Sequence, residues 1–441
     1  MHFTRRRLER SAGALLVAGS FSAASCSNSE ADSHPNVFDA GAEASNEAFI
    51  DASKADDAGA QLLDAGPLPI VCASAPCATA LVTTLGADAD DRSEGFCALL
   101  SDGTVACWGA NNAGQLGRGD DAGTVESANA MRVLGLSDIV MLDHTCAVDR
   151  GGGVWCWGTG PFLEQDAGSV TTMRAPVKLD LPPATSVGLG HAVACAAVSD
   201  GVLCWGSNTD AQLSPLEIES SNAGQPARIS MPAGAAIRAL VVGRATFVLR
   251  EEGSLLTWGA NPPAGRVSPL FPDPYPQSIA LGGLVMADLA HDNACAVASG
   301  RGYCWGAPAV QYGGSPLERA LPEPVVTPEP IAQIATTRNY VQNGVVVEHS
   351  RWCASAVSGA VYCWGQNDSG QAGDGSQDYA SVAVRVNGLP ERAAQVRTTS
   401  STTCALLTNG TVYCWGNNHS GQLGNGQSRG KSVAPVKVVL P

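Results

Sequence analysis

Cysteine is the residue type whose number and spacing point most clearly to chemistry in this sequence. The chain has 15 cysteines among 441 residues, and because this number is odd, at least one cysteine must stay outside any set of internal disulfides. The other fourteen fall into seven pairs whose members lie five, nine or ten residues apart. The pairs are Cys72 with Cys77, Cys97 with Cys107, Cys146 with Cys156, Cys195 with Cys204, Cys295 with Cys304, Cys353 with Cys363, and Cys404 with Cys414.

The wider spacings fit disulfides across β-hairpins. In the first repeat, the turn Ser101–Gly103 places Cys97 directly opposite Cys107, and in the pairs spaced by nine the turn is one residue shorter. Opposed residues of antiparallel strands have Cα atoms about 4.5–5.5 Å apart, which a disulfide can bridge. One repeat carries Phe247 and Thr257 instead and has lost both cysteines together, as expected if the partners bond to each other. Structural zinc prefers closer Cys-x₂₋₄-Cys spacings, so we predict disulfides, with buried free thiols as the alternative.

The cysteine pairs belong to a longer repeat that ends in Trp-Gly. Its first copy, residues 97–109, returns with few changes as residues 404–416. Seven of the nine tryptophans occupy the same repeat position, and a period near 50 residues is typical of propeller-type arrays. These tryptophans are Trp108, Trp157, Trp205, Trp258, Trp305, Trp364 and Trp415.

Both faces of each predicted hairpin are apolar. Alternation along the strands puts Cys97 and Val105 on one face and Ala98 and Trp108 on the other. Strands that are buried on both sides suit blades that are sandwiched between neighbouring blades. The sequence therefore predicts an all-β fold in which each repeat builds one blade.

The motif Cys-Ala-Leu-Leu-Ser-Asp-Gly-Thr-Val-Ala-Cys-Trp-Gly-Ala-Asn-Asn-Ala-Gly-Gln-Leu-Gly, which starts at Cys97, resembles the repeat of the regulator of chromosome condensation family. It is most similar to the cysteine-paired bacterial version, a repeat type that a β-lactamase-inhibitory protein also uses. The resemblance covers about residues 79–441 and implies a seven-bladed β-propeller. In that family the ring closes by joining the two chain ends in one blade, so we expect residues 433–440 to pair with residues 80–96.

The N-terminus is predicted to be an export signal. Arg5–Arg7 give a basic start, residues 12–24 are apolar or small, and the stretch is too short to span a bilayer. Residues 23–26 resemble a bacterial lipobox, so we predict a lipoprotein signal peptide over residues 1–25 and lipid modification of Cys26. Ordinary signal cleavage, with Cys26 incidental, is the alternative.

Residues 26–71 are predicted to form a tether between the lipid anchor and the propeller of residues 72–441. The segment is rich in Ala, Asp and Gly, is strongly acidic and has few large apolar side chains, so it cannot bury enough surface to fold. The whole chain has a formal net charge of −15. This charge argues against binding to nucleic acid or to an anionic membrane surface, both of which use clusters of lysine and arginine.

Two groups of side chains are candidate metal sites. His144, His191, His291 and His349 lie at equivalent repeat positions shortly before the first cysteine, where blades would form a ring. No carboxylate pattern supports a ligand set, so we expect neither a metal nor any other cofactor. Asp88, Asp90, Asp91 and Glu94 could hold Ca²⁺, but they lack the glycine and ligand spacing of an EF-hand, and a solvated acidic loop is the favoured interpretation.

Loops that depart from the repeat are the candidate binding surface. One is stiffened by prolines between residues 262 and 276, and another lies between residues 316 and 351. The alternative is that these loops are connections whose sequences have diverged from the repeat without gaining a binding function. The candidate binding residues are Leu270, Phe271, Tyr275, Tyr340, Arg351 and Trp352.

Taken together, these features predict a monomeric lipoprotein of the bacterial cell envelope, at the outer membrane or cell surface. It would bind an unidentified protein partner through loops on one rim, without catalysis. One alternative is an inhibitor of the β-lactamase-inhibitory type. Another is a hydrolase or lyase that acts on polysaccharide with acids at the central opening. We expect no catalytic residues, because no convergent carboxylate pair can be located in the sequence.

Overall fold

A computed structural model describes residues 66–86, 94–163, 170–213, 226–306, 320–337, 340–342, 345–348 and 350–441. The predicted signal peptide, Cys26, most of the predicted tether, Asp88, Asp90, Asp91 and His349 therefore lie outside the described residues. Within the described ranges, no helix is both long and apolar enough to cross a bilayer.

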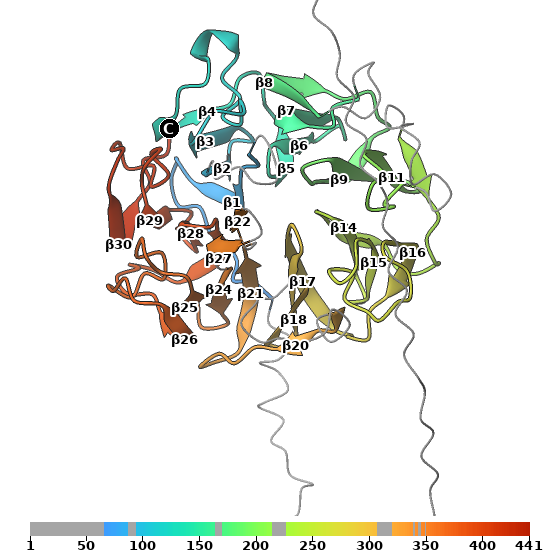
Figure 1. Cartoon of the computed structure of the whole chain (residues 1–441). Coiled ribbons are helices and arrows are strands. Elements are labelled where there is room, and N and C mark those ends of the chain that lie inside the picture. The colour runs from blue at the N-terminus through green and yellow to red at the C-terminus, as the bar shows by residue number, and fades with distance from the viewer. Residues whose placement is uncertain are drawn as a thin grey trace, which may run out of the picture. The chain divides into compact units, whose positions relative to one another are not determined.

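Seven four-stranded antiparallel sheets form a ring, and each sheet is one blade (Figure 1). Blade one contains β1 (Ala78–Thr83), β2 (Gly95–Leu100), β3 (Val105–Gly109) and β4 (Ser127–Arg132). Blade two contains β5 (Ile139–Asp143), β6 (Cys146–Asp149), β7 (Val154–Gly160) and β8 (Thr171–Lys178). Blade three contains β9 (Ala184–Leu189), β10 (Val193–Val198), β11 (Gly201–Gly206) and β12 (Ala227–Ile229). Blades four and five contain β13 (Ile237–Val242), β14 (Ala245–Arg250), β15 (Leu255–Gly259) and β16 (Asp273–Ser278); and β17 (Leu284–Ala290), β18 (Asn293–Ala298), β19 (Arg301–Gly306) and β20 (Glu323–Pro324).

The last two blades complete the ring, and blade six carries an insertion. They contain β21 (Ile331–Thr336), β24 (Arg351–Ala356), β25 (Val361–Gly365) and β26 (Ala380–Arg385); and β27 (Ala393–Thr398), β28 (Thr402–Leu407), β29 (Val412–Asn417) and β30 (Lys431–Lys437). A separate hairpin of β22 (Tyr340–Gln342) and β23 (Val345–Glu348) lies between β21 and β24, and a short 3₁₀ helix, η1 (Asp120–Ala122), lies in blade one. The fold class predicted from the repeat is therefore confirmed.

The cysteine pairs predicted from spacing are the disulfides of the structure. Each of the six wider pairs joins the second and third strands of its blade, with Cα atoms 4.0–4.1 Å apart. Register explains both spacings, because the two cysteines face each other across the hairpin whether the turn is longer or shorter. Cys72 and Cys77 form the seventh bridge. The six cross-strand bridges join Cys97 to Cys107, Cys146 to Cys156, Cys195 to Cys204, Cys295 to Cys304, Cys353 to Cys363, and Cys404 to Cys414.

The ring does not close in the way that the family resemblance implied. The C-terminal strand β30 pairs with β29 in its own blade, and β1 pairs with β2, so the two chain ends do not share a sheet. The prediction that residues 433–440 pair with residues 80–96 was wrong. Side chains and loops join blade one to blade seven instead. The Leu81 amide donates to Gln395 Oε1 at 3.0 Å, and Arg397 Nε donates to the Leu81 carbonyl at 3.1 Å.

The segment before β1 also contacts blade seven. The Val71 amide donates to the Thr408 carbonyl at 2.7 Å, and the partly buried Ile70 packs against the apolar cluster between blades one and seven. Residues that precede Cys72, the predicted start of the propeller, therefore already pack against the propeller.

The repeat tryptophans hold neighbouring blades together. In the described part of the chain, six indoles donate their Nε1–H to a backbone carbonyl in the loop that follows the third strand of the preceding blade, at 2.5–2.9 Å. Trp415, for example, donates to the Gln371 carbonyl at 2.9 Å. The remaining tryptophan, Trp364, is only partly buried and stacks on Trp352 with ring centroids 6.1 Å apart.

The two faces of the ring carry different connections. We call the side with the first-to-second and third-to-fourth strand connections of each blade the loop face, and the opposite side the turn face. The turn face has short turns, such as residues 101–104, 299–300 and 408–411. On the loop face, the longer connections among the described residues include residues 110–126, 260–272 and 418–430.

Candidate binding face

A cavity opens on the loop face at the axis of the ring. Its volume is about 470 Å³, and its walls are the ends of the innermost strands together with the turns that follow them. Residues from all seven blades contribute, so the cavity belongs to the ring as a whole. Its lining includes Thr83, Glu94, His144, His191, Asp210, Arg244, Asp288, His291, Thr336, Arg397 and Ser400.

Among the described residues, three acids line the cavity, and protein groups engage each of them. Asp210 forms an ion pair with Arg244 at 2.8 Å. Glu94 accepts hydrogen bonds from the Ser401 amide at 2.7 Å, from the Ser401 hydroxyl at 2.8 Å and from the Thr402 hydroxyl at 2.9 Å. These contacts fix Glu94 against blade seven and close the ring at this point.

Asp288 is the third acid, and it accepts the amide N–H of Thr336 at 2.8 Å. Burial raises the pKa of Asp288, partly offset by the charge of Arg397, and burial also raises the pKa of Glu94. The three carboxylates are therefore bound to protein donors rather than arranged around a shared substrate position. The catalytic alternative gains no support from these contacts.

Arg397 differs from the other charged residues of the cavity. Its Nε donates to the Leu81 carbonyl at 3.1 Å, while its Nη1 has no hydrogen-bond partner in the described part of the chain. No ion pair joins Arg397 to a described carboxylate within 4 Å. Arg397 also lines the cavity, so a guanidinium without an ion-pair partner among the described residues lies at the cavity wall.

Three of the four predicted ring histidines line the cavity. His144 hydrogen-bonds the Thr83 carbonyl through Nδ1 at 2.9 Å, and because a carbonyl only accepts, Nδ1 carries the proton. His291 Nδ1 lies 3.4 Å from Asp292 Oδ1. Among the residues that the structure describes, no group of three or more His, Cys, Asp or Glu side chains is placed to hold a metal ion.

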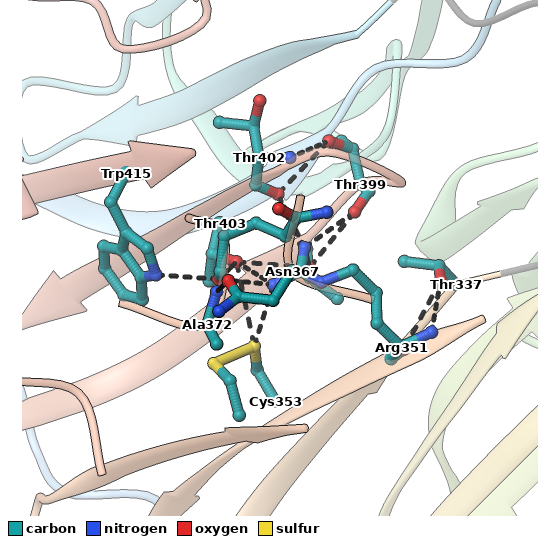
Figure 2. The surroundings of a disulfide bond; sticks show 12 residues. Thr337, Arg351, Cys353, Asn367, Ala372, Thr399, Thr402, Thr403 and Trp415 are labelled. Atoms are coloured by element: carbon teal, nitrogen blue, oxygen red, sulfur yellow. Dashed lines mark hydrogen bonds between the residues drawn. A yellow bond between two sulfur atoms is a disulfide. The ribbon is translucent and has the colours of Figure 1, made fainter. Parts of the chain in front are cut away.

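Arg351 is not a surface binding residue, and this prediction was wrong. Its side chain is fully buried between blades six and seven, beside the Cys353–Cys363 disulfide (Figure 2). The guanidinium donates to the Gln371 carbonyl at 2.6 Å and the Thr399 carbonyl at 2.9 Å, and it also bonds the hydroxyls of Thr398 and Thr403. Burial lowers its pKa to about 9, so the side chain stays charged at neutral pH.

The other predicted residues of this loop have different positions. Trp352 is partly buried, and its ring stacks on Trp364. Tyr340 begins β22, and its side chain lies outside the described atoms.

The predicted residues of the blade-four loop are exposed. Leu270 is 41% exposed, Phe271 56% and Tyr275 49%, and the neighbouring Val267 is 61% exposed. We call these four residues the blade-four patch. The sequence prediction named three of them and missed Val267, which no repeat motif marks.

A buried ion pair holds the blade-four patch in place. Arg266 bonds Asp273 and also donates to the carbonyls of Thr257 at 3.1 Å and Tyr275 at 2.8 Å. Asp273 in turn accepts the Tyr275 amide at 3.0 Å. Burial alone would raise the pKa of Asp273, but hydrogen bonds from Arg266, Ser268 and the Tyr275 amide hold it below its ordinary value. The loop is thus cross-linked from within while its apolar side chains face solvent.

Comparison with known proteins identifies the repeat. Models of the regulator of chromosome condensation (RCC1) repeat match residues 93–115, 394–422 and 409–441. The ultraviolet-B receptor UVR8 of Arabidopsis thaliana is 28% identical over 359 residues, which cover 78% of this chain and 68% of UVR8. The human E3 ubiquitin-protein ligase HERC2 is 42% identical over 74 residues, which are 17% of this chain and 2% of HERC2.

Solved structures of the same architecture superpose on the chain. Prp20p of Saccharomyces cerevisiae matches with a TM-score of 0.60 and 18% identity, over 77% of this chain and 87% of that protein. Human WBSCR16 matches with a TM-score of 0.58 and 18% identity, over 77% of this chain and 94% of that protein. At these identities the likeness shows the shared fold.

Proposed function

Because this chain is a β-propeller built from regulator of chromosome condensation repeats, we propose that it is a non-catalytic protein-binding module that works outside the cytoplasm. We propose further that it binds its partner through the loop face. The yeast propeller Prp20 supports a role in protein binding, since one solved structure shows it bound to Kap60 and another is described together with its binding to Gsp1p and histones. Those partners belong to Prp20.

The observation that carries the proposal is the rigid apolar patch of blade four. Exposed aromatic and aliphatic side chains on a rigid scaffold are typical of protein-binding hot spots, because little conformational entropy is lost when they are buried. Phe271 and Tyr275 supply the aromatic area, and the Arg266–Asp273 ion pair supplies the rigidity. The variable connections on the same face would add specificity.

Two features support a location outside the cytoplasm. Disulfides persist in oxidising compartments and are rare in the cytosol, and this chain has seven of them. The N-terminal sequence has the basic start, apolar stretch and lipobox-like end of a lipoprotein signal. We propose that lipid on Cys26 anchors the protein in the bacterial cell envelope, that residues from 26 onward hold the propeller away from the membrane, and that the propeller is a monomer.

Affinity capture from solubilised cell-envelope extract tests this function. The bait is the purified protein with its disulfides intact, and the control bait is the same protein after reduction and alkylation. The proposal predicts that the intact bait retains a defined protein that the control bait does not retain. Repeated captures without such a protein, or equal retention by both baits, would contradict it.

A further inference from the structure

The axial cavity of the loop face has the size and lining of a small-molecule site. Its volume of about 470 Å³ falls in the range of roughly 300–1,000 Å³ that is usual for such sites. The apolar residues Val242, Leu289 and Ala335 line it together with polar groups. Because every blade contributes to the wall, the site is formed before any ligand arrives.

Among the charged groups of the described cavity lining, the protein engages the acids but leaves Arg397 without an ion-pair partner. Glu94, Asp210 and Asp288 already accept protein hydrogen bonds or an ion pair. Arg397 makes a single hydrogen bond through Nε in the described part of the chain, and its Nη1 has no acceptor there. Hydroxyl groups, such as that of Ser400, lie along the same wall. A ligand that binds the Arg397 guanidinium must supply acceptors, because a guanidinium only donates.

The charge of the cavity limits how much negative charge a ligand can carry. One guanidinium, that of Arg397, lacks an ion-pair partner among the described residues, while the charge of Asp288 is close enough to interact with it. A second negative charge on the ligand would lie near Asp288, and the only other arginine or lysine of the described lining, Arg244, is already paired with Asp210. The lining therefore favours one negative charge and an apolar body that contacts Val242 and Leu289.

We propose that the cavity binds a small monocarboxylate with an apolar body, and that Arg397 holds its carboxylate. Arg397 donates to the carboxylate oxygens, Ser400, which also lines the cavity, supplies a hydroxyl donor, and the apolar body fills the space beside Leu289. The site lies on the same face as the blade-four patch but does not depend on the proposed protein partner.

Titration calorimetry of the intact protein with benzoate and hexanoate as probes tests the proposal. At least one probe should bind saturably, and at least tenfold more tightly than benzamide, succinate or inorganic phosphate. Arg397→Gln should weaken that binding at least tenfold, whereas Arg150→Gln, at an exposed position on the turn face, should leave it unchanged. Failure of both probes to saturate, equal binding of benzamide, tighter binding of phosphate, or unchanged binding by Arg397→Gln would each overturn the proposal.

A second variant keeps the test valid if Arg397→Gln does not fold. Ala290→Phe leaves Arg397 in place and puts a ring at the partly exposed end of β17 that lines the cavity. It should abolish probe binding without changing the thermal unfolding midpoint by more than a few degrees. Probe binding as in the unchanged protein would show that the ligand lies elsewhere and would overturn the assignment.

Discussion

The guanidinium of Arg351 joins blade six to blade seven from a position where other repeats carry small or uncharged side chains. Gly95, Ala245 and Thr402 begin the second strands of their blades at the equivalent point. Arg351 instead reaches across the interface to the Thr399 carbonyl of the next blade, and the charge of buried Glu94 partly compensates its own. The sequence has no local signal for this burial, because the groups that accept its hydrogen bonds are distant in the chain.

Replacing Arg351 by Met should destabilise the protein by about 3 kcal/mol, because several buried carbonyls lose their donor and Glu94 loses a compensating charge. Urea unfolding at pH 7 measures the change. The matched control is Arg150→Met, at an exposed position, which should stay within about 0.5 kcal/mol of the unchanged protein. Equal effects of the two substitutions would show that the buried contacts of Arg351 contribute nothing to stability.

The Arg266–Asp273 pair predicts a pH dependence. The pKa of Asp273 lies below its ordinary value of 3.8, so the folded state binds this proton less readily than the unfolded state. Its contribution to stability is therefore present above about pH 4 and is lost as the pH falls through the pKa of the folded state. Asp273→Asn should be less stable than the unchanged protein at pH 7, and the difference should shrink at pH 3.

Chemical unfolding at both pH values measures that difference, and Asp180→Asn, at an exposed position, serves as the control. A difference between the Asp273→Asn and unchanged proteins that is the same at pH 3 and pH 7 would contradict the role of the ion pair.

The glycine-rich loop of blade seven packs under the tryptophan of blade one. Gly424 has φ +60°, and a Cβ placed there would lie 2.8 Å from Val438 and 2.9 Å from Trp108. Gly430, in the same connection, has φ +84° but no atom within 4 Å of a Cβ. The two positions share the backbone requirement for glycine and differ only in crowding.

Gly424→Ala should therefore lower stability by clearly more than Gly430→Ala, by about 1–3 kcal/mol in addition to the shared cost of a positive φ. Thermal unfolding of the two variants side by side gives the comparison. Equal losses would mean that the loop moves away from Trp108 freely, and that the tryptophan does not hold it.

Much of each blade could be predicted because its determinants are local and periodic. The spacing of Cys97 and Cys107 specifies a hairpin register, and alternation specifies which face carries Trp108. The hydrogen bond from Trp108 to the Gln422 carbonyl could not be predicted, because it joins residues at opposite ends of the chain. The same reason explains why the closure of the ring was predicted wrongly.

In the ring as a whole, the repeated structural features and the candidate binding surfaces have different distributions. Regular turns and disulfides repeat around it, whereas the axial cavity and the blade-four patch both lie on the loop face. Leu270, Phe271 and Tyr275 could be predicted as candidate binding residues because they interrupt the repeat. The cavity could not be predicted as a binding site, because its wall is assembled from residues at the ends of strands in seven different blades.

The most direct test of partner binding through the loop face compares matched surface variants. Surface plasmon resonance measures the affinity of the captured partner for the unchanged protein, for a double variant that combines Leu270→Asp with Phe271→Asp, and for Val326→Asp. Val326 is 90% exposed on the turn face and serves as the control. We expect the blade-four double variant to weaken binding at least thirtyfold, an effect of about 2 kcal/mol, and Val326→Asp to leave it unchanged. Unchanged binding by the double variant, or an equal loss with Val326→Asp, would contradict binding through the loop face.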